Sequence, residues 1–400
     1  MSTKIVYIYS SVIFLMMCAS YSLSFTWNIH IAIWDFLAVI VSIVLFINIP
    51  KPINEIKRTI GLISVLLLNY FYNIFTSINP IGAFFLSFMV AICSALVIWS
   101  PLSVKQRLFD ISSLFTTIIL SISLFGWFLY LLGYPLPSEP VTDFDDGFHT
   151  YINYHFFLIQ DQIFFDFLPR FGSVFLEPGQ MSSICVILLL ANILLKGRKI
   201  DMVIMSISIF LSFSLAGWLV LIICLLVMLF MKIRNKVLLV VSFALIIGFF
   251  AFVVEYISED SLIGHYIVER LEYDEENGIS GNNRTNDDFD YRYERFLKTD
   301  GVYFGINKQL AEGNNWTIGN AGVKRVIVQY GYVGLFLVLS LVFVLFYHYK
   351  SRDGFILFLG YFILGAIRTF WTCPYWLYIL ICTLPLIKTN SKLIIKKSDI

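Results

Sequence analysis

Long apolar runs occupy most of the chain, and short polar or basic segments separate them. A helix needs about 20 apolar residues to cross a bilayer. Runs that reach or approach this length predict twelve spans, at residues 5–25, 31–49, 59–78, 81–99, 111–133, 179–195, 200–215, 216–231, 237–257, 322–347, 355–371 and 374–387. The pattern therefore predicts an all-α polytopic integral membrane protein.

Basic residues concentrate in the short segments on one side of the predicted spans. They are Lys4, Lys51, Lys57, Arg58, Lys105, Arg107, Lys196, Arg198, Lys199, Lys232, Arg234, Lys236, Lys350, Arg352, Lys388, Lys392, Lys396 and Lys397. By the positive-inside rule this side is cytoplasmic, and both termini lie on it. Merging the runs 200–215 and 216–231 would place neighbouring basic segments on opposite sides, which favours two separate spans.

Two large loops, at about 134–178 and 258–321, fall on the other side and hold most of the 27 acidic residues. They divide the chain into an N-terminal five-helix bundle (1–133), the first loop (134–178), central membrane helices (179–257), the second loop (258–321), and C-terminal membrane helices with a cytoplasmic tail (322–400). The aromatic-rich segment 152–168 predicts an interfacial helix. Residues 286–298, acidic at the start and basic at the end, predict a second loop helix.

Composition supports a membrane protein and excludes some functions. Only 14% of the residues are charged, against about 25% in soluble domains. The net charge of +1 gives no sign of a nucleic-acid partner. The six cysteines lie in apolar runs without metal-ligand spacing. The acidic cluster at 143–146 could hold a divalent ion or form a solvated loop, and we expect neither a metal nor a cofactor.

The stretch from Arg170 to Ser182 carries the strongest candidate chemistry, because a polar loop there enters an apolar helix. Pro178 suits the first helical position, which places Glu177 at the N-cap. In the structural interpretation, Glu177 caps the helix and Arg170 pairs with it or with a lipid phosphate. In the functional interpretation, Arg170 binds a pyrophosphate through its planar donor fork, and Glu177 orients or deprotonates a hydroxyl.

Further cations could bind the same substrate. Arg284 in a glycine-led turn either anchors the pyrophosphate or pairs with nearby loop aspartates, and Arg292 and Arg295 on one helix face are its substitutes. Lys324 and Arg325 begin the tenth span, where they either extend to lipid headgroups or line a cleft. Arg368 lies late in the eleventh span, and a charge at that depth usually faces a cavity or a partner.

These residues resemble the O-antigen polymerases, the Wzy family, which is related to the O-antigen ligases. The layout of about a dozen spans with two large loops on the periplasmic side is similar. Arg170 followed by Phe175-Leu-Glu177-Pro178-Gly looks like the family's Arg and Phe-x-Glu-Pro segment. Ser212-Phe-Ser214-Leu-Ala-Gly217, which opens the eighth span, is similar to its Ser-x-x-Gly.

The second loop continues the resemblance in the order Arg284, Phe304-Gly305, Gly319-Asn320, Gly331 and Gly334. Ligases place a histidine where Asn320 aligns. Because asparagine cannot serve as a base, the chain resembles a polymerase more than a ligase.

The resemblance implies a membrane glycosyltransferase of the bacterial inner membrane. It would transfer a growing glycan from undecaprenyl pyrophosphate to a lipid-linked repeat unit on the periplasmic face. Glu177, Arg170 and Arg284 would be catalytic. The substrate-binding residues would be Arg368, Asn320, Arg292, Arg295, Lys324 and Arg325. Membrane lipid, a chain-length regulator and a flippase are the expected partners. The alternatives are an O-antigen ligase and, in another class, a flippase or transporter of the same lipid-linked oligosaccharide.

Overall fold

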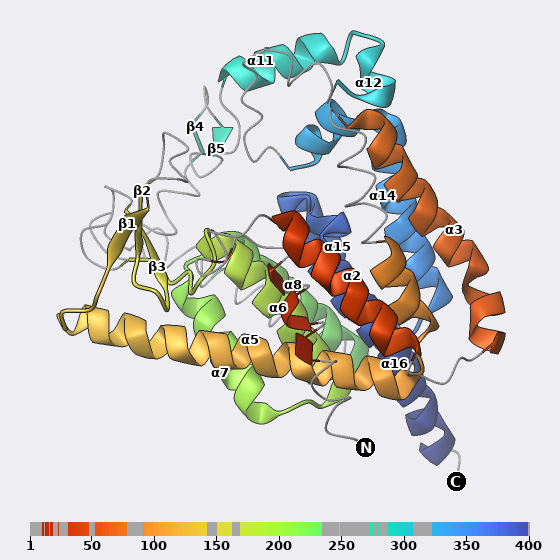
Figure 1. The fold of residues 1–400 in the computed structure, drawn as a ribbon, viewed down its shortest axis with the longest axis horizontal. Coiled ribbons are helices and arrows are strands. Elements are labelled where there is room, and N and C mark those ends of the chain that lie inside the picture. Colours follow the sequence, from red (N-terminus) through yellow and green to blue (C-terminus); the bar gives the residue numbers. More distant parts are fainter. Residues whose placement is uncertain are drawn as a thin grey trace.

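The computed structural model describes residues 31–47, 53–77, 91–141, 150–161, 169–233, 273–274, 278–279, 287–306 and 322–398, with residue 248 and a few positions between 10 and 23. This part of the chain is mainly helical (Figure 1). Its long helices are α2 (Ile31–Ile47), α3 (Ile53–Thr76), α5 (Leu102–Leu131), α6 (Pro178–Leu195), α7 (Lys199–Leu211), α8 (Leu215–Lys232), α14 (Val323–His348), α15 (Arg352–Arg368) and α16 (Pro374–Ser398).

Among the described residues, five helices are long and apolar enough to cross a membrane, by length and composition: α3 from Lys57, α5, α6, α8 and α14. The prediction of a helical membrane protein is confirmed at this level. The runs 200–215 and 216–231 are indeed separate helices, although the 13 residues of α7 are fewer than the roughly 17 that a full crossing needs. The run 237–257 and much of 5–25 and 81–99 fall outside the described residues, so the count of twelve stays a prediction.

Three helices extend further toward the basic segments than the apolar runs predict. Helix α3 begins at Ile53, and α5 begins at Leu102 after Pro101. Lys57, Arg58, Lys105 and Arg107 therefore lie in the first turns of helices instead of in loops, and α16 continues to Ser398. Lysine, arginine and glutamine are good helix formers, so each helix continues beyond its apolar residues into the basic segment.

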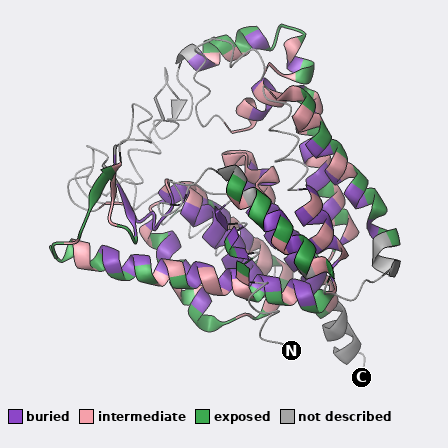
Figure 2. Ribbon diagram, viewed as in Figure 1, coloured by how far each residue is buried: buried purple, intermediate pink, exposed green. Residues whose placement is uncertain are grey.

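Helix α6 lies at the centre of the bundle. It packs against α7, α8, α15 and α16 and is buried on nearly every side (Figure 2). A helix that is apolar all round needs such an environment. By contrast, α3, α5, α8 and α14 expose large apolar side chains such as Phe125 and Phe336, as helices do when they face lipid.

The first loop contains a small antiparallel sheet instead of the predicted interfacial helix. Its strands, in the order β1-β2-β3, are β1 (Glu139–Val141), β2 (Thr150–Asn153) and β3 (Leu158–Asp161). The helix prediction is therefore wrong for residues 152–161, and residues 162–168 lie outside the described part. The chain reverses direction between β2 and β3 through a tight turn. In this turn Asn153 Oδ1 accepts the His155 N–H at 2.8 Å, and His155 adopts a left-handed φ of 66°. Asparagine and histidine favour such turns over helix.

The hairpin of β2 and β3 is fixed to α5. Ser123 Oγ donates to the Phe156 carbonyl at 2.6 Å, and the Phe157 ring lies against Gly126, where an added Cβ would be 3.1 Å away. Tyr154 stacks on Phe157 with ring centroids 4.8 Å apart. The sheet thus provides a rigid base for the segment that leads into α6.

The described part of the second loop holds two short helices, α11 (Asp287–Phe296) and α12 (Gly301–Phe304), and a two-stranded ladder of β4 (Tyr273–Asp274) and β5 (Gly278–Ile279). Helix α11 confirms the helix predicted at 286–298. The chain after α12 docks on α14 where Gly331 interrupts the helical dihedral angles with φ 68° and ψ −176°. The break exposes carbonyls, so Val328 O accepts the Ile306 N–H at 2.9 Å and Tyr330 O accepts the Tyr72 hydroxyl at 2.7 Å.

Candidate functional site

The site begins where α6 starts. Glu177 occupies the N-cap with φ −121° and ψ 134°, and Pro178 follows in the first turn, as the sequence predicts. The Glu177 side chain, however, makes no capping hydrogen bond to the helix. The interpretation in which this carboxylate serves as a helix cap is therefore wrong, and its orientation needs another explanation.

Arg368 provides that explanation. It is the last residue of α15, and its Nη1 donates to Glu177 Oε2 in an ion pair. The side chains are only 14% and 30% exposed, respectively, so the pair lies at the edge of the bundle and remains partly open to solvent. The prediction that Arg368 faces a cavity or a partner is confirmed, and its partner is the candidate catalytic carboxylate.

Gly179 makes room for this arginine. A Cβ at position 179 would lie 2.7 Å from Arg368 Cζ and still closer to Nη2. Arg368 Nε is buried and has no hydrogen-bond partner among the described residues. A buried unsatisfied donor is uncommon and often marks a functional site or an ordered water. In the sequence, Gly179 stands out only as the glycine after Pro178 in the segment that resembles the polymerases, and no role was predicted for it.

A tight turn fixes Arg368 at the end of α15. Thr369 takes a left-handed φ of 59°, and the buried Trp371 in the short helix η3 (Phe370–Thr372) folds back on α15. The Trp371 indole donates to Phe362 O at 3.1 Å, and the Tyr361 hydroxyl donates to Trp371 O at 2.6 Å. Gly365 accommodates the indole, because an added Cβ would lie 2.8 Å from its Cγ.

Arg170, eight residues before α6 begins, contacts the turn between α7 and α8. Its Nε donates to Ser212 O at 3.0 Å, and the next residue, Phe171, donates its N–H to Leu211 O at 3.0 Å. Arg170 is only partly buried. Ser173 O accepts the Leu158 N–H from β3 at 2.8 Å. The segment leading from Arg170 to Glu177 is therefore held by the sheet on one side and by the α7–α8 turn on the other.

The same turn packs closely on α6. Ser214 caps α8 by accepting the Gly217 N–H at 3.4 Å. A Cβ on Gly217 would lie 3.1 Å from Ser182 Cβ and closer still to Ser182 Oγ. The Ser-x-x-Gly at 214–217 thus brings the starts of α6 and α8 together, beneath the Glu177–Arg368 pair.

Lys324, in the first turn of α14, connects that helix to α11 of the second loop. Lys324 Nζ pairs with Asp290 Oδ1 of α11 at 2.6 Å and lies 5.4 Å from the Tyr293 ring centroid. Burial raises the pKa of Tyr293, and Tyr332 adds to this effect, so the ring stays neutral beneath the ammonium. Both partners of the ion pair are more than 40% exposed, so the pair links α11 to α14 but contributes little stability.

The remaining predicted site residues fall into three groups. Arg292 and Arg295 are exposed on α11, which Figure 1 shows well apart from α6, so they do not join the Glu177–Arg368 pair in this arrangement. Arg325 is half-buried in the first turn of α14, after Gly322, whose added Cβ would lie 3.1 Å from Ala366 O near the end of α15. Arg284 and Asn320 lie outside the described residues, as does the acidic cluster at 143–146.

The fold and the site together define a helical membrane protein with an arginine–glutamate pair where two central helices meet. Comparison of the chain with protein-family models, curated proteins and solved structures gave no match.

Proposed function

We propose that this protein polymerises surface-polysaccharide repeat units on the periplasmic face of the bacterial inner membrane. The proposal includes the twelve-span topology with both termini in the cytoplasm. One observation carries it: Arg368 at the end of α15 pairs with Glu177 at the start of α6, although 191 residues separate them. A basic group for a phosphate and a carboxylate for a hydroxyl thus stand side by side, as transfer from a lipid pyrophosphate requires.

In the proposed reaction, the acceptor hydroxyl attacks the anomeric carbon of the glycan on its lipid pyrophosphate. The new oxygen–carbon bond forms as the bond from that carbon to the phosphate oxygen breaks. The electron pair leaves with the pyrophosphate, and the hydroxyl proton passes to Glu177. Guanidinium groups stabilise the charge that develops on the leaving group, and a planar donor fork suits a phosphate.

In this proposal, substrate binding also breaks the Glu177–Arg368 ion pair. Arg368 holds Glu177 before the substrate arrives. A pyrophosphate that binds Arg368 competes with this carboxylate, and the released Glu177 can then accept a hydrogen bond from the acceptor hydroxyl. The carboxylate therefore becomes available as a base when the leaving group is in place.

Arg170 is the second phosphate-binding group in the proposal. Its backbone is fixed between the sheet and the α7–α8 turn, and its Nε donates to Ser212 O as described above, which orients the guanidinium. We assign Lys324, Arg325, Arg292 and Arg295 to the sugars of the glycan, since α11 lies over the outer end of the bundle. Arg284 and Asn320 keep their predicted roles as phosphate and substrate ligands.

The test is the polysaccharide ladder of a strain that lacks this protein, complemented with variants. Wild type should restore the ladder. Glu177→Gln, Arg368→Lys and Arg170→Ala should leave a single capped repeat unit. Arg107→Gln, at the opposite end of the bundle, is the control and should behave as wild type.

Other outcomes separate the alternatives. Bare lipid A core in the deletion strain would indicate a ligase. Accumulation of lipid-linked repeat units on the cytoplasmic face would indicate a flippase. A normal ladder from both Glu177→Gln and Arg368→Lys at wild-type protein levels would refute the assignment of this pair.

A further inference from the structure

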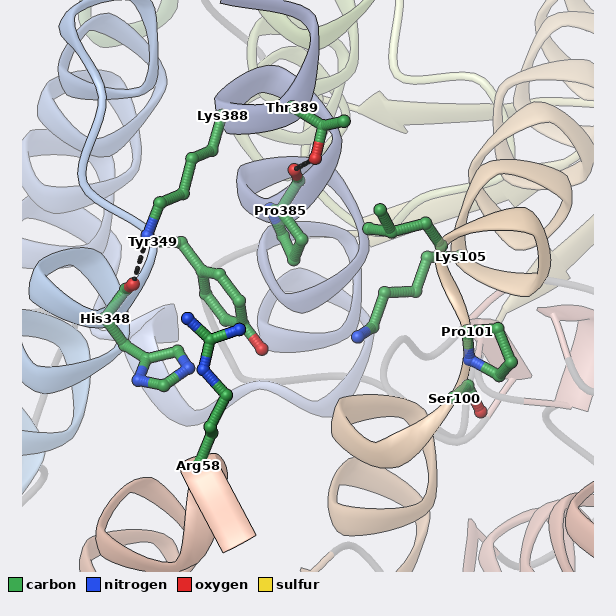
Figure 3. A pocket seen from close by; sticks show the side chains of 10 residues that line it. Arg58, Ser100, Pro101, Lys105, His348, Tyr349, Pro385, Lys388 and Thr389 are labelled. Carbon is green, nitrogen blue, oxygen red and sulfur yellow. Dashed lines mark hydrogen bonds between the residues drawn. The ribbon is translucent and has the colours of Figure 1, made fainter. Parts of the chain in front are cut away.

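A pocket of about 420 Å³ lies at the end of the bundle opposite the candidate site, and it gathers positive charge. Arg58 of α3, Lys105 of α5 and Lys388 of α16 line it. Its other lining residues are Ser100, Pro101, Leu102, His348, Tyr349, Pro385 and Thr389. None of the ten is acidic. Figure 3 shows the three cationic side chains extending from three different helices toward His348 and Tyr349.

Lys105 is the unusual member of this pocket. Lys105 is 3% exposed. Its Nζ donates to Ile98 O at 2.8 Å and lies 6.0 Å from the centroid of the Tyr349 ring. An ammonium has three donors and no acceptor, and burying such a charge is costly unless anions or hydrogen bonds compensate it. Lys388 Nζ donates to the main-chain oxygen of His348 at 2.8 Å, which holds a second ammonium at the rim of the pocket.

The depth of the pocket indicates what could enter it. The apolar part of α3 begins at Lys57, α5 begins at Leu102 and α14 ends at His348. The pocket therefore lies where three membrane-crossing helices end, at the level of the lipid headgroups. Basic pockets between helices on the cytoplasmic side commonly bind anionic lipid headgroups.

We propose that this pocket binds the phosphate of an anionic phospholipid of the inner leaflet. Arg58 and Lys105 bind the phosphate from two sides, Lys388 contributes long-range attraction, and the acyl chains lie along the apolar faces of the neighbouring helices. The occupied pocket ties α3, α5, α14 and α16 together at their inner ends. The assignment to the inner leaflet rests on the topology proposed above, but the inference is independent of the polymerase activity, because none of the pocket residues belongs to the Glu177–Arg368 site.

The experiment uses the full-length protein purified in a neutral detergent. Its thermal midpoint is followed while phosphatidylglycerol, cardiolipin, phosphatidylcholine or inorganic phosphate is added. Wild type should be stabilised by the two anionic lipids at low mole fraction, and by neither phosphatidylcholine nor inorganic phosphate at matched concentration. Arg58→Gln should weaken the apparent affinity for the anionic lipids about fivefold, and Lys105→Gln by at least as much.

Arg107→Gln is the matched control, because Arg107 is an exposed cation two residues from Lys105 that does not line the pocket. It should leave the apparent affinity unchanged. Because Lys105→Gln could impair folding, the exposed Arg58 provides the decisive variant. Equal stabilisation by phosphatidylcholine would overturn the proposal, as would an equal loss of affinity in Arg107→Gln. Saturation of the effect by inorganic phosphate alone would show that a free anion, not a lipid, is the ligand.

Discussion

Replacing Gly179 with alanine tests the geometry of the candidate site most directly. The new Cβ would lie 2.7 Å from Arg368 Cζ, whereas carbon contacts settle at about 3.5–4.0 Å. The guanidinium must therefore retreat by about 1 Å, which removes its hydrogen bond to Glu177. A hydrogen bond to a charged group contributes about 1.5–3 kcal/mol. We take the lower part of that range, because the Glu177 side chain is 30% exposed and solvent screens it.

Helix propensity acts in the opposite direction. Alanine is favoured over glycine by up to about 1 kcal/mol within a helix. The net expectation for Gly179→Ala is destabilisation by about 1 kcal/mol. Gly61→Ala is the control: Gly61 lies within α3, and an added Cβ there meets nothing within 4 Å. That substitution should stabilise the protein by up to about 1 kcal/mol, so the two alanines should have opposite signs.

The assay is unfolding by sodium dodecyl sulfate followed by tryptophan fluorescence, with the variants compared in one detergent. A double-mutant cycle of Gly179→Ala with Arg368→Ala isolates the contact. Once the arginine is gone, the alanine at 179 should become neutral or stabilising, with a coupling energy of about 1–2 kcal/mol. If Gly179→Ala stabilises wild type as much as Gly61→Ala does, Arg368 does not lie over Gly179, and the reasoning about the site fails.

Three further substitutions test how the bundle and the loop layer are held. Gly331→Ala should destabilise the protein by about 1–3 kcal/mol, because Gly331 has a φ of 68° and an added Cβ would lie 2.5 Å from the Phe304 nitrogen. Faster amide hydrogen exchange in residues 301–306 would show this destabilisation, and exchange at the wild-type rate would contradict it. Tyr72→Phe should cost about 0.5–1.5 kcal/mol, since its hydroxyl donates to a carbonyl beside that break at 2.7 Å; an unchanged unfolding midpoint would show that the bond contributes nothing. Asp201→Ala should cost about 1–3 kcal/mol, because this carboxylate is 1% exposed and accepts the Ser113 hydroxyl at 2.7 Å between α7 and α5; a wild-type midpoint in the same titration would argue that the buried contact is unimportant.

The first loop shows where sequence reasoning failed. Residues 152–161 are dense in aromatic side chains, which a membrane-surface helix and a packed hairpin both require. The hairpin is stabilised by Ser123 and Gly126 of α5 and by pairing with β1. These contacts join segments distant in sequence, so local periodicity could not distinguish the two structures.

The sequence alone determined the positions of the apolar helices α3, α5, α6, α8 and α14. A helix buried in lipid needs a long apolar segment, and such a segment can be recognised directly in the sequence. It also determined that α6 starts at Pro178 with Glu177 before it, since proline acts through its own backbone. Only the tertiary structure decided that Glu177 faces Arg368 instead of capping its helix, and that Arg58, Lys105 and Lys388 share one pocket. Both arrangements depend on how helices far apart in the sequence pack. For Glu177 and Arg368, the cost of leaving a charge unpaired in the bundle favours the pairing.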